Sequence, residues 1–327
     1  MKAFVTGATG FIGQNLVKRL IADSWEVSVL IRSKGKMGDL DGKKVNIVSG
    51  DLTDLSKVKN ALKKNDVVFN LAAVLMHHKL PEKKYWETNV TGLENLLKIY
   101  QNSNIKRFVH VSTVGIYGPT GGKMLDESSP IHPSDIYSRT KATAENLLFR
   151  YYKKTGFPMT IVRPTIAFGP GDLRPGFSNL FPLVKKKLFI PIGDGKNFFH
   201  TVYVENLVQG LILAATHKNA IGEDFIIGDD PCPTMEKLIR TIAEVEGVTL
   251  FPLSLPQDLA LLIGKAFDLG DKFNIPQVLN SKRVKFITEN RKYDISKAKK
   301  LIGYHPFFDL KTGIQKTFDW YQEKGLI

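Results

Sequence analysis

The sequence contains almost no cysteine, which limits how the fold can be stabilised. Cys232 is the only cysteine among the 327 residues, so no disulfide can form within the chain. Because disulfides are rare in reducing compartments, we expect a cytoplasmic protein. A chain of this length can bury a core large enough to be stable without cross-links, as one large domain or two smaller ones.

Long apolar runs are also missing. No run approaches the roughly 20 residues that a membrane-spanning helix needs, so we expect no transmembrane segment. The chain starts directly with the short apolar run Ala3-Phe4-Val5, which is typical of a strand. This start leaves no room for a secretory signal, and we expect none.

Acidic residues are fewer than basic ones. The 32 Asp and Glu residues oppose 46 Lys and Arg residues, which gives a net charge of +14. Such an excess can indicate nucleic acid or an anionic membrane surface as a partner. Here the lysines are scattered as doublets with one triplet at 185–187, and no basic stripe with interleaved aromatic residues is present. We therefore predict a solvated, lysine-rich surface and no nucleic-acid partner.

Glycine is concentrated in one stretch near the start of the chain, Gly7-Ala8-Thr9-Gly10-Phe11-Ile12-Gly13. It follows the apolar run at 3–5 and precedes residues 14–20, whose apolar positions share one helical face. A glycine turn between a strand and a helix lets the backbone approach a pyrophosphate, and the helix N-terminus offers free N–H groups. The stretch predicts a dinucleotide site.

Strands and helices alternate along the first half of the chain. This rhythm predicts a parallel, doubly wound sheet. We expect strands at 3–5, 26–31, 45–48, 67–71, 107–111 and 159–162, and helices at 14–20, 55–62, 85–100 and 137–154. The predicted fold class is α/β, a Rossmann-type doubly wound parallel sheet with a smaller, mostly helical C-terminal substrate domain.

The pattern changes after Pro164. Residues 168–200 are rich in Gly, Pro and Phe, whereas 202–228 resume the strand and helix pattern. We predict a dinucleotide-binding domain over 1–168 to which 202–228 return, and a substrate-binding domain built from 169–201 and 229–327. The second domain should cover the carboxyl ends of the strands, where ligands bind in this architecture.

A tyrosine and a lysine share one face of the helix expected at 137–154. Tyr137 and Lys141 are four residues apart, and an ammonium beside a phenol lowers the tyrosine pKa toward neutrality. Such a tyrosine can exchange a proton with a carbonyl or alcohol oxygen. Tyr293 and Lys297 have the same spacing but lie late in the chain, so we place the chemistry at Tyr137.

Hydroxyl side chains follow the fifth strand. Ser112 and Thr113 come directly after Val111. They could form an ordinary turn. They could also hydrogen-bond a substrate oxygen beside Tyr137.

Together these motifs resemble the extended short-chain dehydrogenase/reductase family, within the NAD-dependent epimerase/dehydratase superfamily. The glycine stretch is similar to the family's T-G-A-T-G-F-I-G, and 109–118 are similar to its V-S-S-x-x-x-Y-G. Further matches follow in chain order at Gly50-Asp51-Leu52, Asn70-Leu71-Ala72-Ala73, Asn89-Val90-Thr91-Gly92, Arg163-Pro164, 169–172, 293–297 and 303–306.

The resemblance implies a nicotinamide cofactor and roles for individual residues. Tyr137 would be the acid or base, Lys141 would lower its pKa and hold the nicotinamide ribose, and Thr113 would orient the substrate oxygen. Asn89 would support the site. The implied cofactor contacts are Gly7, Thr9, Gly10, Phe11, Ile12, Gly13, Arg32, Ser33, Asp51, Leu52, Leu71, Ala72, Ala73, Tyr137, Lys141 and Pro164. We expect no metal ion.

The end of the second strand predicts NADP rather than NAD. In this family an acidic residue after the strand bonds the ribose 2′-hydroxyl, whereas an arginine accommodates a 2′-phosphate. Here Ile31 holds the acidic position, Arg32 and Ser33 follow, and the first carboxylate is Asp39. NAD is the alternative.

The substrate is predicted to be largely apolar. Family members that act on nucleotide sugars often carry an arginine for the diphosphate where this chain has Phe199, although Lys196 could substitute. The apolar segments 177–199 and 259–267 could be the core of the small domain or the wall of an apolar chamber.

We predict a dehydrogenase or reductase of the hydroxysteroid-dehydrogenase-like or dihydroflavonol-reductase-like branch. A nucleotide-sugar epimerase or dehydratase and a non-catalytic NADP sensor are the alternatives. A homodimer is left open.

Overall fold

A computed structural model describes residues 1–32, 44–53, 59, 64–100, 103–174, 176–250, 254–270 and 280–327, with only the backbone of 269 and 270. Ser33 and Asp39 lie outside these residues, as does the helix predicted at 55–62 apart from Lys59. The predictions that rest on them are therefore not addressed below.

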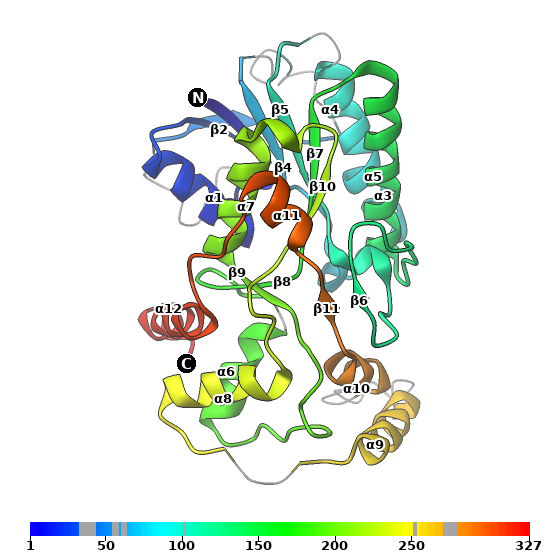
Figure 1. The fold of residues 1–327 in the computed structure, drawn as a ribbon, viewed down its shortest axis with the longest axis vertical. Coiled ribbons are helices and arrows are strands. Elements are labelled where there is room, and N and C mark those ends of the chain that lie inside the picture. Colours follow the sequence, from blue (N-terminus) through cyan, green and yellow to red (C-terminus); the bar gives the residue numbers. More distant parts are fainter. Residues whose placement is uncertain are drawn as a thin grey trace.

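A seven-stranded parallel sheet forms the centre of the fold (Figure 1). Its strands lie in the order β10-β7-β5-β4-β1-β2-β3. They are β1 Lys2–Thr6, β2 Glu26–Ile31, β3 Asn46–Ser49, β4 Val67–Asn70, β5 Arg107–Val111, β7 Met159–Pro164 and β10 Asp224–Ile227. The chain order reverses between β1 and β4, and ligands bind at such a reversal, outside the carboxyl ends of the strands. The predicted fold class is confirmed.

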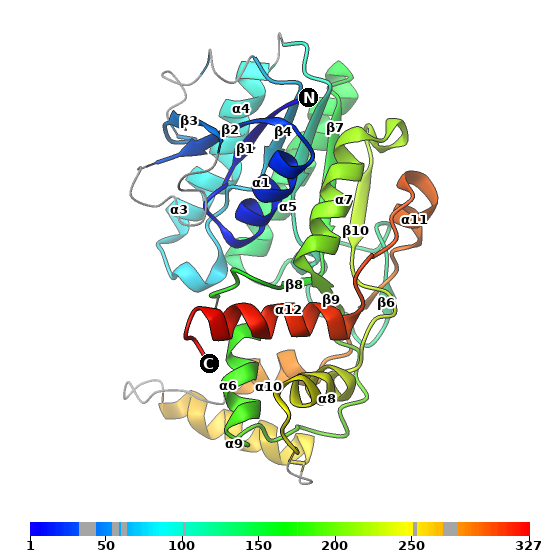
Figure 2. The ribbon, with the colours of Figure 1, turned by 90° about the vertical axis from the view of Figure 1, so that its left-hand side faces the viewer.

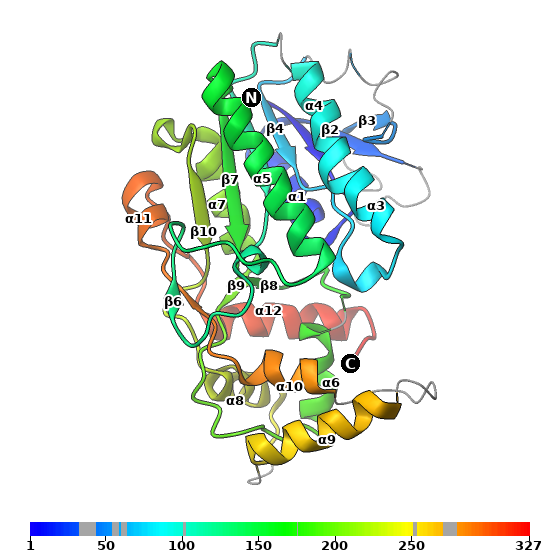
Figure 3. The ribbon, with the colours of Figure 1, turned by 90° about the vertical axis from the view of Figure 1, so that its right-hand side faces the viewer.

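Helices cover both faces of this sheet (Figures 2 and 3). Helices α1 Phe11–Ala22 and α7 Val204–Thr216 pack on one face, and α4 Gly92–Tyr100 and α5 Ile136–Thr155 pack on the other. The central strands are buried on both faces, which explains their continuous apolar character.

The helix predicted at 85–100 is interrupted. The structure divides this region into α3 Glu82–Trp86, the π-helical turn η4 Glu87–Thr91 and α4. Apolar spacing alone does not reveal such a turn, because the side chains on either side keep a helical arrangement. π-helical turns occur frequently at functional sites.

Five further helices lie beyond the carboxyl ends of the strands (Figure 1). They are α6 Leu180–Lys185, α8 Met235–Glu246, α9 Gln257–Gly270, α10 Ser281–Thr288 and α12 Leu310–Glu323. Figure 2 shows α12 lying across the molecule between the sheet region and helices α6 and α8. The core of this part is largely aromatic and includes Phe168, Phe181 and Tyr321.

Two segments are placed differently from the predicted arrangement. We predicted that residues 202–228 return to the dinucleotide-binding domain. Their first strand, β9 Thr201–Tyr203, pairs with β8 Ile166–Phe168 in a separate two-stranded sheet. Helix α11 Ser296–Ile302, which we assigned to the covering domain, packs against β10 and α7. A third small sheet joins β6 Met124–Leu125 to β11 Lys292–Tyr293. The exact domain division stays a prediction.

One buried amide joins the sheet region to the chain that leads into α12. Asn206 Nδ2 donates to Asp229 Oδ1 at 2.8 Å and to the Phe308 carbonyl at 2.8 Å. Its Oδ1 accepts from the N–H groups of Phe307 and Phe308, each at 3.0 Å. Asp229 also accepts from the Tyr203 N–H at 2.9 Å. Asn206 thus connects α7, the end of β10 and the start of α12.

Candidate active site

The glycine turn lies between β1 and α1, at the carboxyl edge of the sheet. Gly7 has φ +69°, and a Cβ there would lie 2.7 Å from the Ala72 backbone nitrogen. A Cβ on Gly13 would lie 2.2 Å from the Gly7 oxygen. At Gly10 the nearest atom would be 3.3 Å away. The fold itself therefore excludes a side chain at Gly7 and Gly13. At Gly10 the nearest atom, the Gly7 oxygen, would have to give by only a few tenths of an ångström, so this glycine suits the close approach of a pyrophosphate.

The N-terminus of α1 is suited to hold an anion. Its N-cap, Gly10, makes no side-chain capping bond, and the first turn carries no acidic residue. The N–H groups of this turn therefore keep their partial positive charge. Thr9, Phe11 and Ile12 lie in the same turn, as predicted for cofactor contacts.

The turns after neighbouring strands surround this loop. The Leu71 N–H donates to the Thr6 oxygen at 3.3 Å, and the Ala72 N–H donates to Thr6 Oγ1 at 3.2 Å. Ala73 follows at the same edge, and Pro164 ends β7 two strands away. Leu71, Ala72 and Ala73 thus border the reversal point of the sheet, whereas Pro164 lies further along the same edge. Their contacts with a cofactor stay predictions.

The residues expected around the adenosine part of a dinucleotide lie at the ends of β2 and β3. Asp51 accepts from the Thr53 N–H at 2.9 Å, and Leu52 is buried beside Gly92. Ile31 is buried, and Arg32 directly after it is exposed. Arg32 is thus available to an anion in solution.

The predicted acid or base and its lysine lie in the first turns of α5. The side chain of Asp135 caps this helix by accepting from the Ser138 N–H at 2.9 Å. Tyr137 as a whole is half-buried, and Lys141 is only 1% exposed. The Lys141 Nζ lies 2.9 Å from Nε2 of His110 on β5.

The expected lowering of the tyrosine pKa is not observed. Burial raises the pKa of Tyr137 to about 12, and the positive charge of Arg174 only partly opposes this effect. Burial also lowers the pKa of Lys141 to about 7, so much of the lysine is uncharged at neutral pH. An uncharged amine stabilises a phenolate much less than an ammonium does, and here desolvation outweighs the neighbouring charge.

Hydroxyl groups meet near the start of α5. Thr113 Oγ1 accepts from the Gly115 N–H at 3.0 Å, which leaves its own hydrogen free to be donated. A Cβ on Gly115 would lie 3.2 Å from Thr113 Oγ1 and 3.1 Å from Ser138 Oγ, so the two hydroxyls flank this glycine. The Ser112 hydroxyl is buried without a hydrogen-bond partner among the described residues.

Asn89 lies in the π-helical turn and holds two parts of the site together. Its Oδ1 accepts from the Val74 N–H at 2.8 Å, and its Nδ2 donates to Thr140 Oγ1 at 2.9 Å. Thr140 precedes Lys141 on α5. Asn89 therefore connects the chain after β4 to the helix that carries the predicted catalytic pair.

Two charged or titratable residues near this site were not predicted. Arg174 stacks its guanidinium 4.7 Å from the Phe11 ring centre and pairs with the buried carboxylate of Asp172 at 2.7 Å. His110 contacts Lys141, as described above. The sequence shows Arg174 only as an arginine after a G-P-G-D turn, and His110 only as a polar residue in an apolar strand.

The arginine of the R-P motif, Arg163, holds neighbouring elements together through buried ion pairs. Arg163 is buried and pairs with Glu145 of α5 at 2.6 Å and with Asp224 of β10 at 2.6 Å. Its Nη1 also donates to Tyr117 Oη at 2.7 Å. Arg163 therefore joins α5, β7 and β10.

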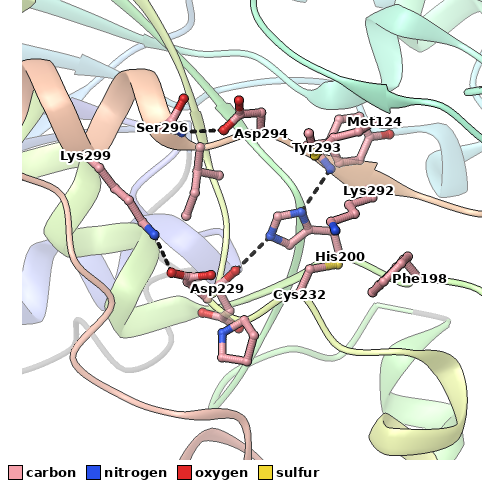
Figure 4. A pocket seen from close by; sticks show the side chains of 13 residues that line it. Met124, Phe198, His200, Asp229, Cys232, Lys292, Tyr293, Asp294, Ser296 and Lys299 are labelled. Carbon is pink, nitrogen blue, oxygen red and sulfur yellow. Dashed lines mark hydrogen bonds and ion pairs between the residues drawn. The ribbon is translucent and has the colours of Figure 1, made fainter.

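Tyr293 lies in a different part of the molecule from Tyr137. It lines a shallow cavity of about 310 Å³ between β6, β11 and the segment after β10 (Figure 4). His200 projects into this region, where Nε2 lies 2.8 Å from the Asp229 carbonyl oxygen and Nδ1 accepts from the Tyr293 N–H at 3.2 Å. Burial lowers the pKa of His200 to about 4, so it is a neutral structural contact.

The wall at the predicted diphosphate position is apolar. Phe199 is buried, and its ring meets Phe286 edge to face at 5.9 Å. Lys196, which could have replaced the arginine, is 79% exposed and lies 3.7 Å from Asp194. Arg291 forms an isolated β-bridge with Phe199. Its side chain stacks on the Phe286 ring and forms an ion pair with Glu289.

The family model of the NAD dependent epimerase/dehydratase family matches residues 3–228. The chain belongs to this family. The match extends from β1 to the end of β10, and so includes the glycine turn, Thr113, Tyr137 and Lys141. The predictions of this family and of a nicotinamide-dependent enzyme are therefore confirmed.

Three known proteins resemble the chain over nearly its whole length. The decarboxylating sterol-4-alpha-carboxylate 3-dehydrogenase of Candida albicans is 30% identical, over 98% of this chain and 97% of that protein. The UDP-glucose 4-epimerase of Vibrio cholerae is 28% identical over 96% of this chain and 93% of that protein. The crystal structure of UDP-glucuronic acid 4-epimerase from Bacillus cereus in complex with NAD has a TM-score of 0.78 at 23% identity, with 99% of both chains covered.

In the ranges that the structure describes, no helix combines the length and the apolar character needed to cross a bilayer. Within those same ranges, no group of three or more His, Cys, Asp or Glu side chains is placed to hold a metal ion.

Proposed function

We propose that this protein is an oxidoreductase that moves a hydride between a nicotinamide cofactor and the alcohol or ketone of a largely apolar, steroid-like molecule. The observation that carries the proposal is Phe199. Its buried ring stands where relatives that bind nucleotide sugars often have an arginine, and Lys196 lies in solvent beside Asp194. The likeness to a sterol dehydrogenase supports the same substrate class.

In this proposal the chain's own residues bind, orient and protonate. The backbone at Gly10, which carries no side chain, and the uncapped start of α1 receive the pyrophosphate. Thr113 donates its hydroxyl hydrogen to the substrate oxygen, and Tyr137 gives that oxygen a proton during reduction or removes one during oxidation. The nicotinamide, when bound, supplies or accepts the hydride.

Replacing Tyr137 with Phe tests this role directly. The ring and its packing remain, but the proton is lost, so turnover should fall by roughly 10²–10⁴-fold while cofactor affinity is nearly unchanged. The assay follows reduced nicotinamide absorbance with a panel of apolar alcohols and ketones. Tyr293→Phe is the matched control and should change turnover little. An equal loss in the control would contradict the assignment.

We further propose that the cofactor is NADP rather than NAD. The exposed guanidinium of Arg32 directly follows β2. Among the described residues after β2, the first carboxylate is that of Asp51. A charge-assisted hydrogen bond to a 2′-phosphate is worth roughly 1.5–3 kcal/mol, which is on the order of tenfold to a hundredfold in dissociation constant.

Calorimetric titration of both cofactors at moderate salt measures this preference. Arg32→Ala should weaken NADP binding by about that factor and leave NAD binding almost unchanged. Lys18→Ala, on the exposed face of α1, serves as a control for general loss of positive charge. Tighter binding of NAD than of NADP by the unaltered protein would exclude the proposal.

A nucleotide-sugar epimerase is the second candidate, and the likeness to the Vibrio cholerae enzyme favours it. An epimerase returns its cofactor to the starting oxidation state, whereas a dehydrogenase leaves it changed. Net formation of reduced nicotinamide from an apolar alcohol therefore supports the dehydrogenase. Conversion of a UDP-sugar without net cofactor change supports the epimerase.

A further inference from the structure

Lys141 has an unusual partner for a buried lysine. It is 1% exposed, and among the described residues no carboxylate lies within ion-pair distance of its Nζ. Glu145, one turn further along α5, holds Arg163 instead, with contacts of 3.1, 3.2 and 2.6 Å. The side chain that meets the Lys141 Nζ is the neutral ring of His110, at 2.9 Å.

A buried hydrogen-bonded chain continues from His110 toward the glycine turn. The His110 Nδ1 lies 3.0 Å from Asn70 Nδ2, and Asn70 Oδ1 accepts from Thr6 Oγ1 at 2.7 Å. Thr6 Oγ1 accepts in turn from the Ala72 N–H at 3.2 Å. His110, Asn70 and Thr6 are all buried. The chain therefore extends from the lysine to the residue directly before Gly7.

This chain supports two protonation states of the lysine. In the orientation of the structure, Asn70 Nδ2 donates to His110 Nδ1, so the imidazole hydrogen lies on Nε2 and is donated to an uncharged Lys141 amine. If the Asn70 amide turns over, His110 donates from Nδ1 to Asn70 Oδ1. The free Nε2 then accepts from a Lys141 ammonium. An imidazole can make both arrangements, because its two nitrogens exchange the roles of donor and acceptor.

We propose that His110 is a positioning residue that sets the protonation state of Lys141, and that Asn70 selects the tautomer of His110 that does so. The proposal rests on the function proposed above, because it concerns the lysine one turn along α5 from Tyr137, the proposed acid or base. Three other charged groups among the described residues act on these side chains. Glu145 on α5 acts on Lys141, whereas Asp135 at the α5 cap and Arg174 in the loop after β8 act on Tyr137.

Two substitutions should shift the lysine in opposite directions. His110→Phe keeps a ring but removes the hydrogen-bond partner of both forms of Lys141. Because the charge-assisted bond to the ammonium is stronger than the bond to the uncharged amine, the pKa of Lys141 should fall by about one unit. Asn70→Asp presents only acceptors to His110 Nδ1, which fixes the hydrogen there and frees Nε2 to accept. The pKa of Lys141 should then rise by about the same amount.

The measurement is an NMR titration of the whole protein with carbon-13 at the lysine Cε, with the Lys141 signal assigned by its loss in Lys141→Met. His110→Gln keeps an acceptor and should return the midpoint close to that of the unaltered protein. His200→Phe is the matched control, because this buried histidine contacts Asp229 and Tyr293 rather than the site. It should leave the Lys141 midpoint unchanged.

An unchanged midpoint in both His110→Phe and Asn70→Asp, or shifts of the same sign, would overturn the proposal. If His110→Phe does not fold, Asn70→Asp and His110→Gln still decide it by the sign of the first shift and the absence of the second. The titration needs no substrate. Opposite shifts without any turnover would therefore uphold this inference while refuting the proposed oxidoreductase.

Discussion

At the scale of single residues, Gly10 and Gly13 are glycines for different reasons. An added Cβ at Gly13 would lie 2.2 Å from a backbone oxygen that cannot move aside, whereas at Gly10 the nearest atom is 3.3 Å away. The fold therefore requires glycine at position 13. Gly10 lies at the predicted pyrophosphate position, where a side chain would take up the room of the phosphates.

Alanine at each position should separate these two requirements. Gly13→Ala should lower the free energy of unfolding by several kcal/mol or prevent folding, as severe overpacking does. Gly10→Ala should leave stability within about 1 kcal/mol, yet weaken cofactor binding at least tenfold because the methyl group occupies the approach of the phosphates. Urea unfolding and calorimetric titration measure the two effects. Equal loss of stability in both variants would contradict this assignment.

Local sequence carries part of the site but not all of it. Gly7, Tyr137 and Lys141 could be predicted because their spacing within one turn or one helix already fixes their relation. The partners of His110 and Arg174 could not, because His110 meets residues 31 and 40 positions away and Arg174 meets Phe11, which lies 163 positions earlier. The error in the Tyr137 pKa has the same origin, since burial is a property of the whole fold.

At the scale of elements, α5 is fixed to the sheet by a buried ion pair in its middle. Arg163 and Glu145 have side chains that are each 2% exposed, and Asp224 extends the group to β10. The catalytic end of the same helix is held separately, by the Asp135 cap and by Asn89. The ion pair therefore supports the position of α5 without entering the chemistry.

Arg163→Met should destabilise the protein by about 3–5 kcal/mol, because it leaves the Glu145 carboxylate buried without its partner. Arg139→Met, on α5 itself, is the control. Arg139 is exposed and lies 3.4 Å from Glu82, so its loss should cost at most about 1 kcal/mol. Urea unfolding of both variants measures the difference. Equal costs would mean that the buried pair contributes no more than a surface pair.

Element type was easier to predict than element pairing. Six strands of the large sheet were predicted from short apolar runs, and α5 from its helical pattern, because local sequence carries these signals even where a strand, such as β3, is largely exposed. The pairing of β9 with β8 and the packing of α11 on β10 depend on contacts between distant segments, which periodicity does not encode.

At the scale of the whole molecule, one buried carboxylate should influence how stability depends on pH. Both oxygens of Glu246 are buried without a hydrogen-bond partner among the described residues, at the carboxyl end of α8. Burial raises its pKa to about 7 from the ordinary 4.5. Between these two values the unfolded chain binds fewer protons than the folded one, so stability falls as pH rises.

Glu246→Gln should remove this loss. At pH 8 the variant should be more stable than the unaltered protein by on the order of 1 kcal/mol, a value reduced for the partial exposure of the residue, and at pH 5 the gain should nearly vanish. Glu244→Gln is the control on the same helix. Glu244 is exposed and paired with Lys311, so its replacement should give no gain at either pH. A pH-independent gain for Glu246→Gln would contradict the mechanism.

The contacts of Asn206 have a consequence for local opening. The N–H groups of Tyr203, Phe307 and Phe308 are all held by Asn206 or by its partner Asp229. None of these amides can exchange its hydrogen for solvent deuterium until the hydrogen bonds of Asn206 and Asp229 break. The Tyr203 amide lies about a hundred residues before the other two in the chain. All three should nevertheless exchange their hydrogens at similar, slow rates, as one cooperative unit that spans the junction between the sheet and α12.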